Sequence, residues 1–262
     1  MSGVALLVPG PFDTVSGGYL YDRRIAEGLR ALGREVRVVE LAGRHPLPDA
    51  AAEAAAREAL GAVPEEARIV VDGLCLPAFA PLAEALERRR AVGLIHHPTA
   101  LERGVPPDDR AALKARECAL FPRMARLIAT SPLTARRLAE EFGADPARIG
   151  VVEPGTDPAP RARGSGGPGV AILSVGALTP RKGHDVLMRA LAGLPDLDWT
   201  LTIAGGARDA VHARGLHALA EELGIARRVT LAGEVDAPTL EALYDRADIF
   251  ALATWWEGYG MA

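Results

Sequence analysis

The amino-acid sequence predicts an α/β fold with two Rossmann-like domains, each built around a parallel β-sheet. Short apolar runs alternate along the chain with stretches whose apolar residues recur at helical spacing, and this alternation is typical of βαβ units. The apolar runs are continuous, as expected for strands that helices cover on both faces. A segment rich in Pro, Gly and Ser, residues 158–169, divides the pattern into two parts.

Six apolar runs precede this segment and predict a first domain over residues 1–157. We expect strands at Val4–Val8, Val36–Leu41, Ile69–Asp72, Val92–His96, Leu127–Thr130 and Gly150–Val152. Helices are expected at Leu20–Leu32 and from Pro132, behind Ser131 as N-cap, to Gly143 as the C-terminal stop. The short connections between these elements predict right-handed crossovers and a parallel sheet.

The segment 158–169 has no apolar face, and we therefore interpret it as an interdomain linker. Four further strands are expected in the second domain, residues 170–262, at Val170–Val175, Thr200–Ala204, Val229–Ala232 and Ile249–Ala253. Between them, apolar residues recur at helical spacing through 186–191 and 216–223. No helical pattern follows the last strand, so the second domain is expected to be incomplete.

Size, charge and cysteine content restrict the class of protein. The 262 residues, 49% of them hydrophobic, suffice for two domains with their own cores. A net charge of −4 disfavours a nucleic-acid partner. Cys75 and Cys118 lie outside any CxxC pattern, which disfavours disulfides and zinc sites and favours a cytoplasmic location. No apolar run is long enough for an integral membrane segment, whereas peripheral contact with a membrane stays open.

Ligands of parallel sheets bind beyond the carboxyl ends of the strands, and four turns of that kind carry candidate residues. The first contains Gly17 and Gly18, whose amides lie directly before an expected helix and suit an anion. The same glycines also fit a tight turn without a ligand. The second contains His96 and His97 at the tip of an expected strand, where the pattern is equally compatible with catalytic and structural roles.

The third turn carries Arg181 and Lys182, between the first strand of the second domain and a helix. Two cations at a helix N-terminus oppose the helix dipole, and an anion bound by both would explain their position. Of the 30 Lys and Arg residues only Lys114 and Lys182 are lysines, so a lysine at 182 indicates a need for a compact charge. A chance surface position is the alternative.

The fourth turn carries Glu257, which follows an apolar strand and precedes Gly258, Tyr259 and Gly260. The carboxylate can accept hydrogen bonds from hydroxyl groups, and the glycines allow backbone amides to approach a ligand closely. A solvent-facing turn is the alternative. The Asp-Leu-Asp sequence at 196–198 is similar to a metal motif of some sugar transferases, but it precedes a strand and we interpret it as a turn. No metal site is expected.

Taken in order, these segments resemble the family-4 glycosyltransferases (GT4), which are retaining enzymes of the GT-B fold. In the first domain the resemblance rests on IHHP, ATSPLTARRL and VVEPGTD. In the second it rests on VGALTPRKGHDVLMRAL, WTLTIAGGA, VTLAGEV and ADIFALATWWEGYGMA. The ordered set from Val175 to Gly260 is its most specific part.

The resemblance implies roles for the candidate residues. Arg181 and Lys182 match the pair that holds the diphosphate of a nucleotide sugar, and Glu257 matches the first acid of an E-x7-E motif that contacts the donor sugar. His96 matches a histidine at the reaction centre, with His97 as the alternative. Backbone roles toward the sugar and the diphosphate are implied for Gly258, Tyr259 and Gly260 and for Gly17 and Gly18.

The implied activity is transfer of a sugar from a nucleotide-diphosphate sugar to an unidentified acceptor, with retention of configuration and without a metal. The second acid of E-x7-E would fall three residues beyond Ala262, so the resemblance also implies a truncated chain. A nucleotide-sugar epimerase of GT-B fold and a non-catalytic nucleotide-binding fragment are the alternatives. A Rossmann dehydrogenase is disfavoured because neither domain has GxGxxG after its first strand.

Overall fold

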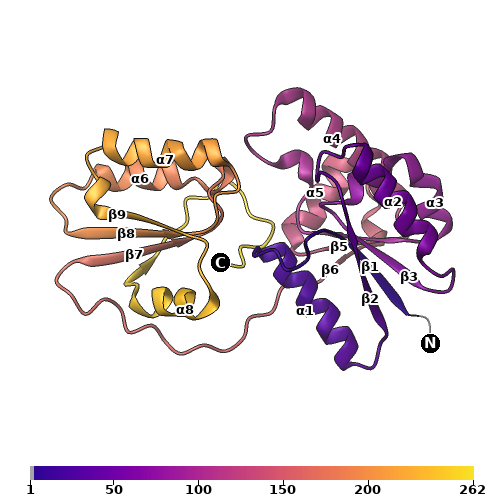
Figure 1. Ribbon diagram of the computed structural model, residues 1–262, viewed down its shortest axis with the longest axis horizontal. Helices are drawn as coiled ribbons and strands as arrows, with labels where there is room; N and C mark the ends of the chain where they lie inside the picture. Colours follow the sequence, from indigo (N-terminus) through magenta and orange to yellow (C-terminus); the bar gives the residue numbers. More distant parts are fainter. Residues whose placement is uncertain (1–2) are drawn as a thin grey trace. The chain divides into compact units, whose positions relative to one another are not determined.

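The computed structural model describes residues 3–262 and confirms the α/β fold with two parallel sheets (Figure 1). The chain forms two compact units. Unit 1 extends to Gly155 and also includes Gly258–Met261, and unit 2 comprises Thr156–Glu257 with Ala262. We predicted residues 258–261 within the second domain, whereas their contacts group them with unit 1.

Unit 1 contains a six-stranded parallel sheet in the order β2-β1-β3-β4-β5-β6. Its strands are β1 (Val4–Pro9), β2 (Val36–Leu41), β3 (Arg68–Asp72), β4 (Val92–Ile95), β5 (Arg126–Ala129) and β6 (Ile149–Val151). Its helices are α1 (Gly17–Ala31), α2 (Ala50–Ala62), α3 (Ala83–Arg88), α4 (Pro107–Leu120) and α5 (Pro132–Phe142), with short 3₁₀ segments η1 (Leu76–Leu82), η2 (Thr99–Leu101), η3 (Phe121–Arg123) and η4 (Pro146–Arg148). Every strand lies within two residues of its predicted bounds.

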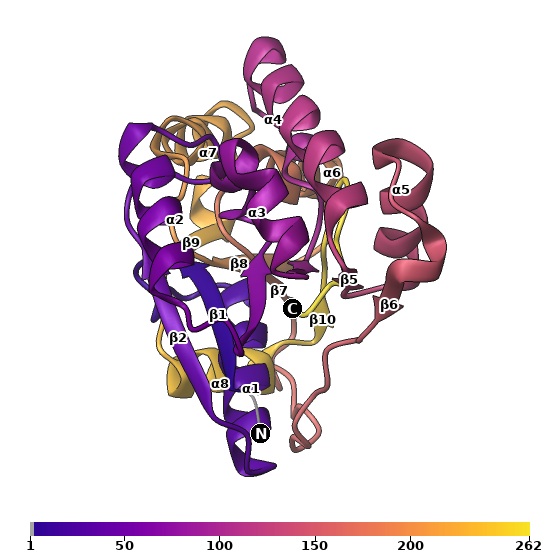
Figure 2. The ribbon, with the colours of Figure 1, turned by 90° about the vertical axis from the view of Figure 1, so that its right-hand side faces the viewer.

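Strand β1 shows why the central strands are continuously apolar. Leu6 and Val8 pack with Ala26 of α1 on one face, whereas Ala5 and Leu7 join the larger cluster on the other face. Figures 1 and 2 show α1 on the first face and α2, α3 and α4 on the second. Burial of one such large aliphatic side chain stabilises the fold by roughly 1.5–3 kcal/mol, so both faces hold β1 in place.

Unit 2 contains a four-stranded parallel sheet in the order β10-β7-β8-β9. Its strands are β7 (Val170–Val175), β8 (Trp199–Ala204), β9 (Val229–Gly233) and β10 (Ile249–Phe250), and its helices are α6 (His184–Ala192), α7 (Ala210–Glu222) and α8 (Ala237–Arg246), with 3₁₀ segments η5 (Pro180–Lys182) and η6 (Ala226–Arg228). Helices α6 and α7 lie on one face of this sheet and α8 on the other (Figure 1). Met188, Leu201, Ile203 and Leu216 are among its fully buried core residues.

Strand β10 is shorter than the five residues that the sequence predicts. Its ladder to β7 continues only as far as the hydrogen bond from Ala251 N to Leu173 O. The chain then leaves the sheet, because Trp255 N donates to Arg181 O at 2.9 Å. The apolar stretch after Phe250 therefore packs against the turn after β7 and does not extend the strand.

The segment 158–169 has neither helix nor strand, as predicted for a linker. Its second half is nevertheless fixed to unit 2. The Arg163 side chain forms an ion pair with Asp245, and Ser165 N donates to Asp248 Oδ1 at 3.0 Å. A segment without an apolar face is thus held by carboxylates that satisfy its backbone and guanidinium donors.

The helix boundaries are set by side-chain caps. Ser131 Oγ accepts a hydrogen bond from Thr134 N at 3.0 Å at the start of α5, and Gly143 ends that helix with a φ of 71°, as predicted. Helix α1 starts earlier than predicted, because Ser16 is its N-cap. Gly17 and Gly18 are therefore the first two helical residues, and the prediction of a loop there was wrong. Within residues 3–262, no helix combines the length and apolar character that a membrane crossing needs.

Candidate active site

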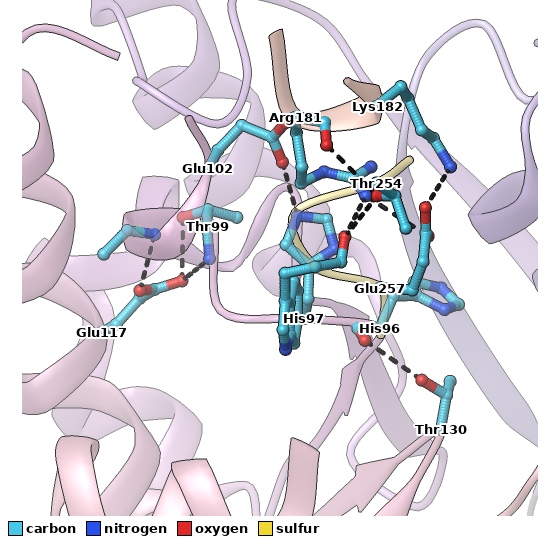
Figure 3. A network of polar contacts seen from close by, with 12 residues as sticks. His96, His97, Thr99, Glu102, Glu117, Thr130, Arg181, Lys182, Thr254 and Glu257 are labelled. Atoms are coloured by element: carbon cyan, nitrogen blue, oxygen red, sulfur yellow. Dashed lines mark hydrogen bonds and ion pairs between the residues drawn. The ribbon is translucent and has the colours of Figure 1, made fainter. Parts of the chain in front are cut away.

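The turn after β7 in unit 2 brings together the predicted residues Arg181, Lys182 and Glu257. Lys182 Nζ lies 2.7 Å from Glu257 Oε1, and Arg181 Nη1 lies 3.3 Å from Glu257 Oε2 (Figure 3). The Arg181 guanidinium also donates to Trp256 O at 2.8 Å. We call these three side chains the cation cluster. They are mostly buried, at 13%, 13% and 20% exposure, so their charges are weakly screened.

The Glu257 carboxyl is ionised in this environment. Burial alone would raise its pKa, but the hydrogen bond from Lys182 and the charges of Lys182 and Arg181 outweigh burial and lower it. Two cations and one carboxylate leave a net charge of +1. The cation cluster can therefore attract an anion while its carboxylate accepts hydrogen bonds from hydroxyl groups.

Arg181 and Lys182 lie directly before a helix, as predicted. They end η5, and the next residue, Gly183, is the N-cap of α6 with a backbone φ of 63°. Their positive charges oppose the dipole at the start of α6, and the Glu257 carboxylate compensates them in part.

Glycines shape the turn that presents these cations. A Cβ on Gly176 would lie 3.1 Å from Cδ and Cε of Lys182, so the lysine stem packs over this glycine. A Cβ on Gly183 would lie 2.1 Å from Ala253 O, which no side chain tolerates. Thr254 Oγ1 also donates to Arg181 O at 3.2 Å. Close contact between the two turns therefore fixes the backbone on both sides of the cation cluster.

In unit 1, the structure places His96 directly after β4 and against two buried aspartates. His96 Nε2 lies 3.0 Å from Asp22 Oδ1 and 3.3 Å from Asp72 Oδ2. Asp22 comes from α1 and Asp72 ends β3, and both are almost completely buried. We call His96, Asp22 and Asp72 the histidine cluster. Of these three residues, only His96 was predicted from the sequence as a site residue.

Two signals in the sequence could have identified the missing aspartates. Asp22 lies next to Tyr21 and four residues before Ala26, on the buried side of α1. Asp72 ends a continuous apolar strand. A carboxylate is rarely buried unless it is paired, so each of these positions indicates a partner inside the protein.

The three groups shift one another's pKa strongly. Burial opposes charge on His96, but its hydrogen bonds to Asp22 and Asp72 and their charges raise its pKa to about 10. Burial and the neighbouring Asp72 raise the pKa of Asp22 to about 7. Asp72 is buried as well, but its hydrogen bonds with His96 and Asp22 and the His96 charge lower its pKa. These shifts favour an imidazolium at His96 at neutral pH, and of the two acids Asp22 holds a proton more readily than Asp72.

The loop after His96 is held by a second buried acid. Glu117 of α4 accepts hydrogen bonds from Thr99 N at 2.5 Å, Thr99 Oγ1 at 2.8 Å and Ala100 N at 3.1 Å (Figure 3). His97 lies 2.9 Å from Glu102 through Nε2, away from the histidine cluster's two acids. Glu117 was not predicted from the sequence, where it is one charge among many in a helix.

Two of the predicted glycines, Gly18 and Gly258, lie near His96. A Cβ on Gly18 would be 3.3 Å from His96 Cδ2, so the first turn of α1 approaches the imidazole closely. Gly17 lies beside Met261 instead. A Cβ on Gly258 would be 2.2 Å from His96 O, and Gly258 O accepts a hydrogen bond from Thr134 Oγ1 at 3.3 Å.

The two remaining predicted residues follow Gly258. Tyr259 is 44% exposed, and Gly260 has a φ of 96°. Residues 258–261 are part of unit 1, whereas Glu257 belongs to the cation cluster of unit 2.

The histidine cluster is also the group, within residues 3–262, whose ligand atoms lie close enough together to hold a metal ion, all within 4.8 Å. No metal site was predicted from the sequence. His96 Nε2 is at hydrogen-bond distance from both carboxylates. We therefore interpret the three side chains as a hydrogen-bonded cluster whose polar atoms satisfy one another.

Comparison with known proteins identifies the family. Residues 65–160 match the family model described as Glycosyltransferase Family 4, and residues 159–262 match Glycosyl transferases group 1. The chain belongs to the GT4 glycosyltransferases. A D-inositol 3-phosphate glycosyltransferase of Mycobacterium sp. (strain KMS) is 36% identical over an alignment of 148 residues, and the match covers 52% of this chain and 33% of that protein. The matched part thus spans about a third of the length of this curated relative.

Solved structures show the same GT-B fold. Sucrose-phosphate synthase from Thermosynechococcus elongatus has a TM-score of 0.77 at 19% identity, covering 100% of this chain and 77% of that one. Anabaena Alr3699/HepE in complex with UDP and glucose has a TM-score of 0.71 at 18% identity, covering 98% of this chain and 76% of that one. Both likenesses extend over the two units of this GT4 chain.

We predict that Gly183→Ala destabilises unit 2 more than Gly224→Ala does. Both glycines have a positive φ, of 63° and 69°, so each alanine incurs about 1–2 kcal/mol of backbone strain. Only Gly183 also faces Ala253 O, which adds about 1–3 kcal/mol of overpacking. Denaturant unfolding of both variants measures the difference. Equal losses would contradict the contact between the two turns.

We also predict that Glu117→Gln lowers the free energy of unfolding by about 1–3 kcal/mol, because the amide loses the charge and places a donor against a backbone N–H. Glu140→Gln is the control, since Glu140 is an exposed residue of α5. Chemical denaturation of the two variants is the measurement. A Glu117→Gln protein as stable as the control would show that the loop does not depend on this carboxylate.

Proposed function

We propose that this chain takes part in transferring a sugar from a nucleotide-diphosphate sugar to an acceptor, with retention of anomeric configuration. The observation that carries the proposal is the cation cluster, in which Arg181 and Lys182 share one carboxylate and keep a net positive charge. Its position beyond β7 is where parallel sheets bind ligands. Unit 2 is accordingly proposed to bind the donor and unit 1 the acceptor.

The chemistry of such a transfer requires a group that stabilises the leaving diphosphate. Negative charge grows on that group as the glycosidic bond breaks, and fixed cations stabilise it without reorganisation. Arg181 offers a planar guanidinium and Lys182 a point charge, both already held by the turn after β7. Glu257 is proposed to orient these cations and to accept a hydroxyl hydrogen bond from the sugar.

The remaining candidate residues are assigned to the same proposal. His96 is proposed to contact the donor sugar at the reaction centre. Amides of Gly17 and Gly18 in the first turn of α1 are proposed to approach the diphosphate, and those of Gly258, Tyr259 and Gly260 to approach the sugar. The relatives named above support a glycosyl transfer in general. HepE, crystallised with UDP-glucose, makes a uridine diphosphate sugar the first donor to test.

We predict that Lys182→Ala weakens binding of UDP-glucose or GDP-mannose to this chain by about ten- to a hundredfold, the loss of one charge-assisted contact. Lys114→Ala is the matched control, because it removes the other lysine, in α4 of unit 1. Isothermal titration calorimetry measures both affinities. Equal binding by the wild-type chain and Lys182→Ala would remove Lys182 from the donor site.

A further inference from the structure

We propose that Asp22 and Asp72 act as positioning residues that keep His96 doubly protonated, with Asp72 as the carboxylate, Asp22 as the carboxylic acid and His96 Nδ1–H as a fixed hydrogen-bond donor. The inference assigns a state to the histidine cluster that the family match does not provide. Its functional part, donation by Nδ1–H to a substrate oxygen, rests on the proposed function. Its structural part is testable without any substrate.

His96 Nε2 carries a proton because of the atoms that face it. This atom faces carboxylate oxygens of Asp22 and Asp72 at 3.0 Å and 3.3 Å. An ionised carboxylate offers only acceptors, so a ring nitrogen without a proton would face a lone pair of whichever acid carries the charge. Nε2 must therefore carry hydrogen, and the burial of both acids makes this interaction strong.

The charge balance of the histidine cluster requires a proton on one of the two acids. Two buried carboxylates and one imidazolium would leave a net negative charge inside unit 1, which burial disfavours. One proton on Asp22 or Asp72 removes that excess, and the two side chains place carboxyl oxygens within 4.8 Å of each other. The histidine cluster is then neutral overall, with one positive and one negative group.

Of the two acids, Asp22 is the one that holds this proton. Asp72 Oδ1 accepts an additional hydrogen bond from Leu74 N at 2.6 Å, in the turn after β3. Asp22 lies inside α1, where the backbone amides are used by the helix, and within residues 3–262 its side chain receives no hydrogen bond from a backbone N–H. A backbone N–H stabilises the ionised form of the acid that it contacts. Asp72 therefore keeps the charge and Asp22 the proton.

The other ring nitrogen, His96 Nδ1, is the one that is available to a ligand. Within residues 3–262, the polar contacts of the His96 ring are all made by Nε2, and the side chain is 19% exposed. Tyr21 packs edge-on against the imidazole at a centroid distance of 5.3 Å. With Nε2 committed to the acids, only Nδ1–H can reach a ligand. A histidine that is already protonated serves there as a donor and cannot act as a general base.

The neighbouring titratable groups do not disturb this assignment. Burial raises the pKa of Tyr21 to about 12, and its hydroxyl donates to Val152 O. Burial also raises the pKa of Cys75 well above its ordinary value, and its thiol lies 3.3 Å from Asp72 O. Burial lowers the pKa of His45, which keeps that imidazole neutral. His97 interacts with Glu102 instead. His96 and Asp22 thus account for the titration of the histidine cluster above pH 5.

We predict different effects of two isosteric variants on the protonation of His96. Asp22→Asn imitates the protonated acid and keeps an oxygen for Nε2, so His96 stays cationic at pH 8. Asp72→Asn removes the carboxylate and lowers the His96 pKa by at least two units, a hundredfold change in its proton affinity. Nitrogen-15 spectra of histidine-labelled protein report the protonation of each ring nitrogen, and His96→Gln identifies the signal.

Several outcomes of this experiment would overturn the proposal. One is a wild-type His96 that titrates near its ordinary pKa, and another is an equal shift in both variants. A third is loss of the His96 signal when one equivalent of Zn²⁺ or Mn²⁺ is added to protein from which a chelator has first removed metal ions. That result would make the histidine cluster a metal site. Circular dichroism confirms that each variant is folded. A correct His96 state together with unchanged donor binding in Lys182→Ala would contradict the proposed function alone.

We also predict a pH dependence of stability that Asp22→Asn removes in part. A raised pKa contributes stability that is complete below the unfolded value and is lost as the pH rises through the folded value. For Asp22 this interval extends from about 3.8 to about 7, and for His96 from about 6.5 to about 10. Between pH 4 and 7 the wild-type Tm should therefore fall relative to that of Asp22→Asn. A constant difference across this interval would show that Asp22 is not protonated in the folded protein.

Discussion

The parallel arrangement of the strands is the constraint on which both clusters depend. In a parallel sheet all carboxyl ends lie at one edge, so residues that follow neighbouring strands meet in space. Asp72 pairs with Leu94 in the ladder between β3 and β4, which places His96 two residues beyond that register. In unit 2, β7 and β10 are neighbours, and the turns that follow them carry Arg181 and Lys182 on one side and Glu257 on the other. Far-separated sequence positions thus become contacts by strand order alone.

Much of the fold could be predicted because burial on both faces leaves a direct trace in the sequence. A strand such as β1 must be apolar at every position, and that pattern cannot be confused with an amphipathic helix. The prediction failed where tertiary contacts decide the boundary. β10 ends early because Trp255 N binds the turn after β7, and α1 begins early because Ser16 caps it. Neither contact has a signal in the hydrophobic pattern.

The residues of the candidate site were also predicted only in part. Arg181, Lys182 and Glu257 stand out in turns, where packing does not require a charge. Asp22 and Asp72 were missed because each lies in an element that the pattern had already explained, one in a helix and one at the end of a strand. Their role becomes evident only in the folded structure, where both lie beside the His96 imidazole. A buried charge is a pairwise property, and a single sequence contains only its separate halves.

The glycines near the two clusters have a common physical role, which differs from flexibility. Gly18 and Gly258 allow helix and chain backbone to approach His96, and Gly176 allows the stem of Lys182 to lie flat on the turn. At each of them a Cβ would be within 3.3 Å of the functional residue. Such glycines bring main chain and charged side chain into contact, which lowers the rotamer entropy that the side chain must lose later. A charge that is already held before a ligand arrives stabilises it at a smaller cost in ordering, and this gives a physical reason for glycine at these three positions.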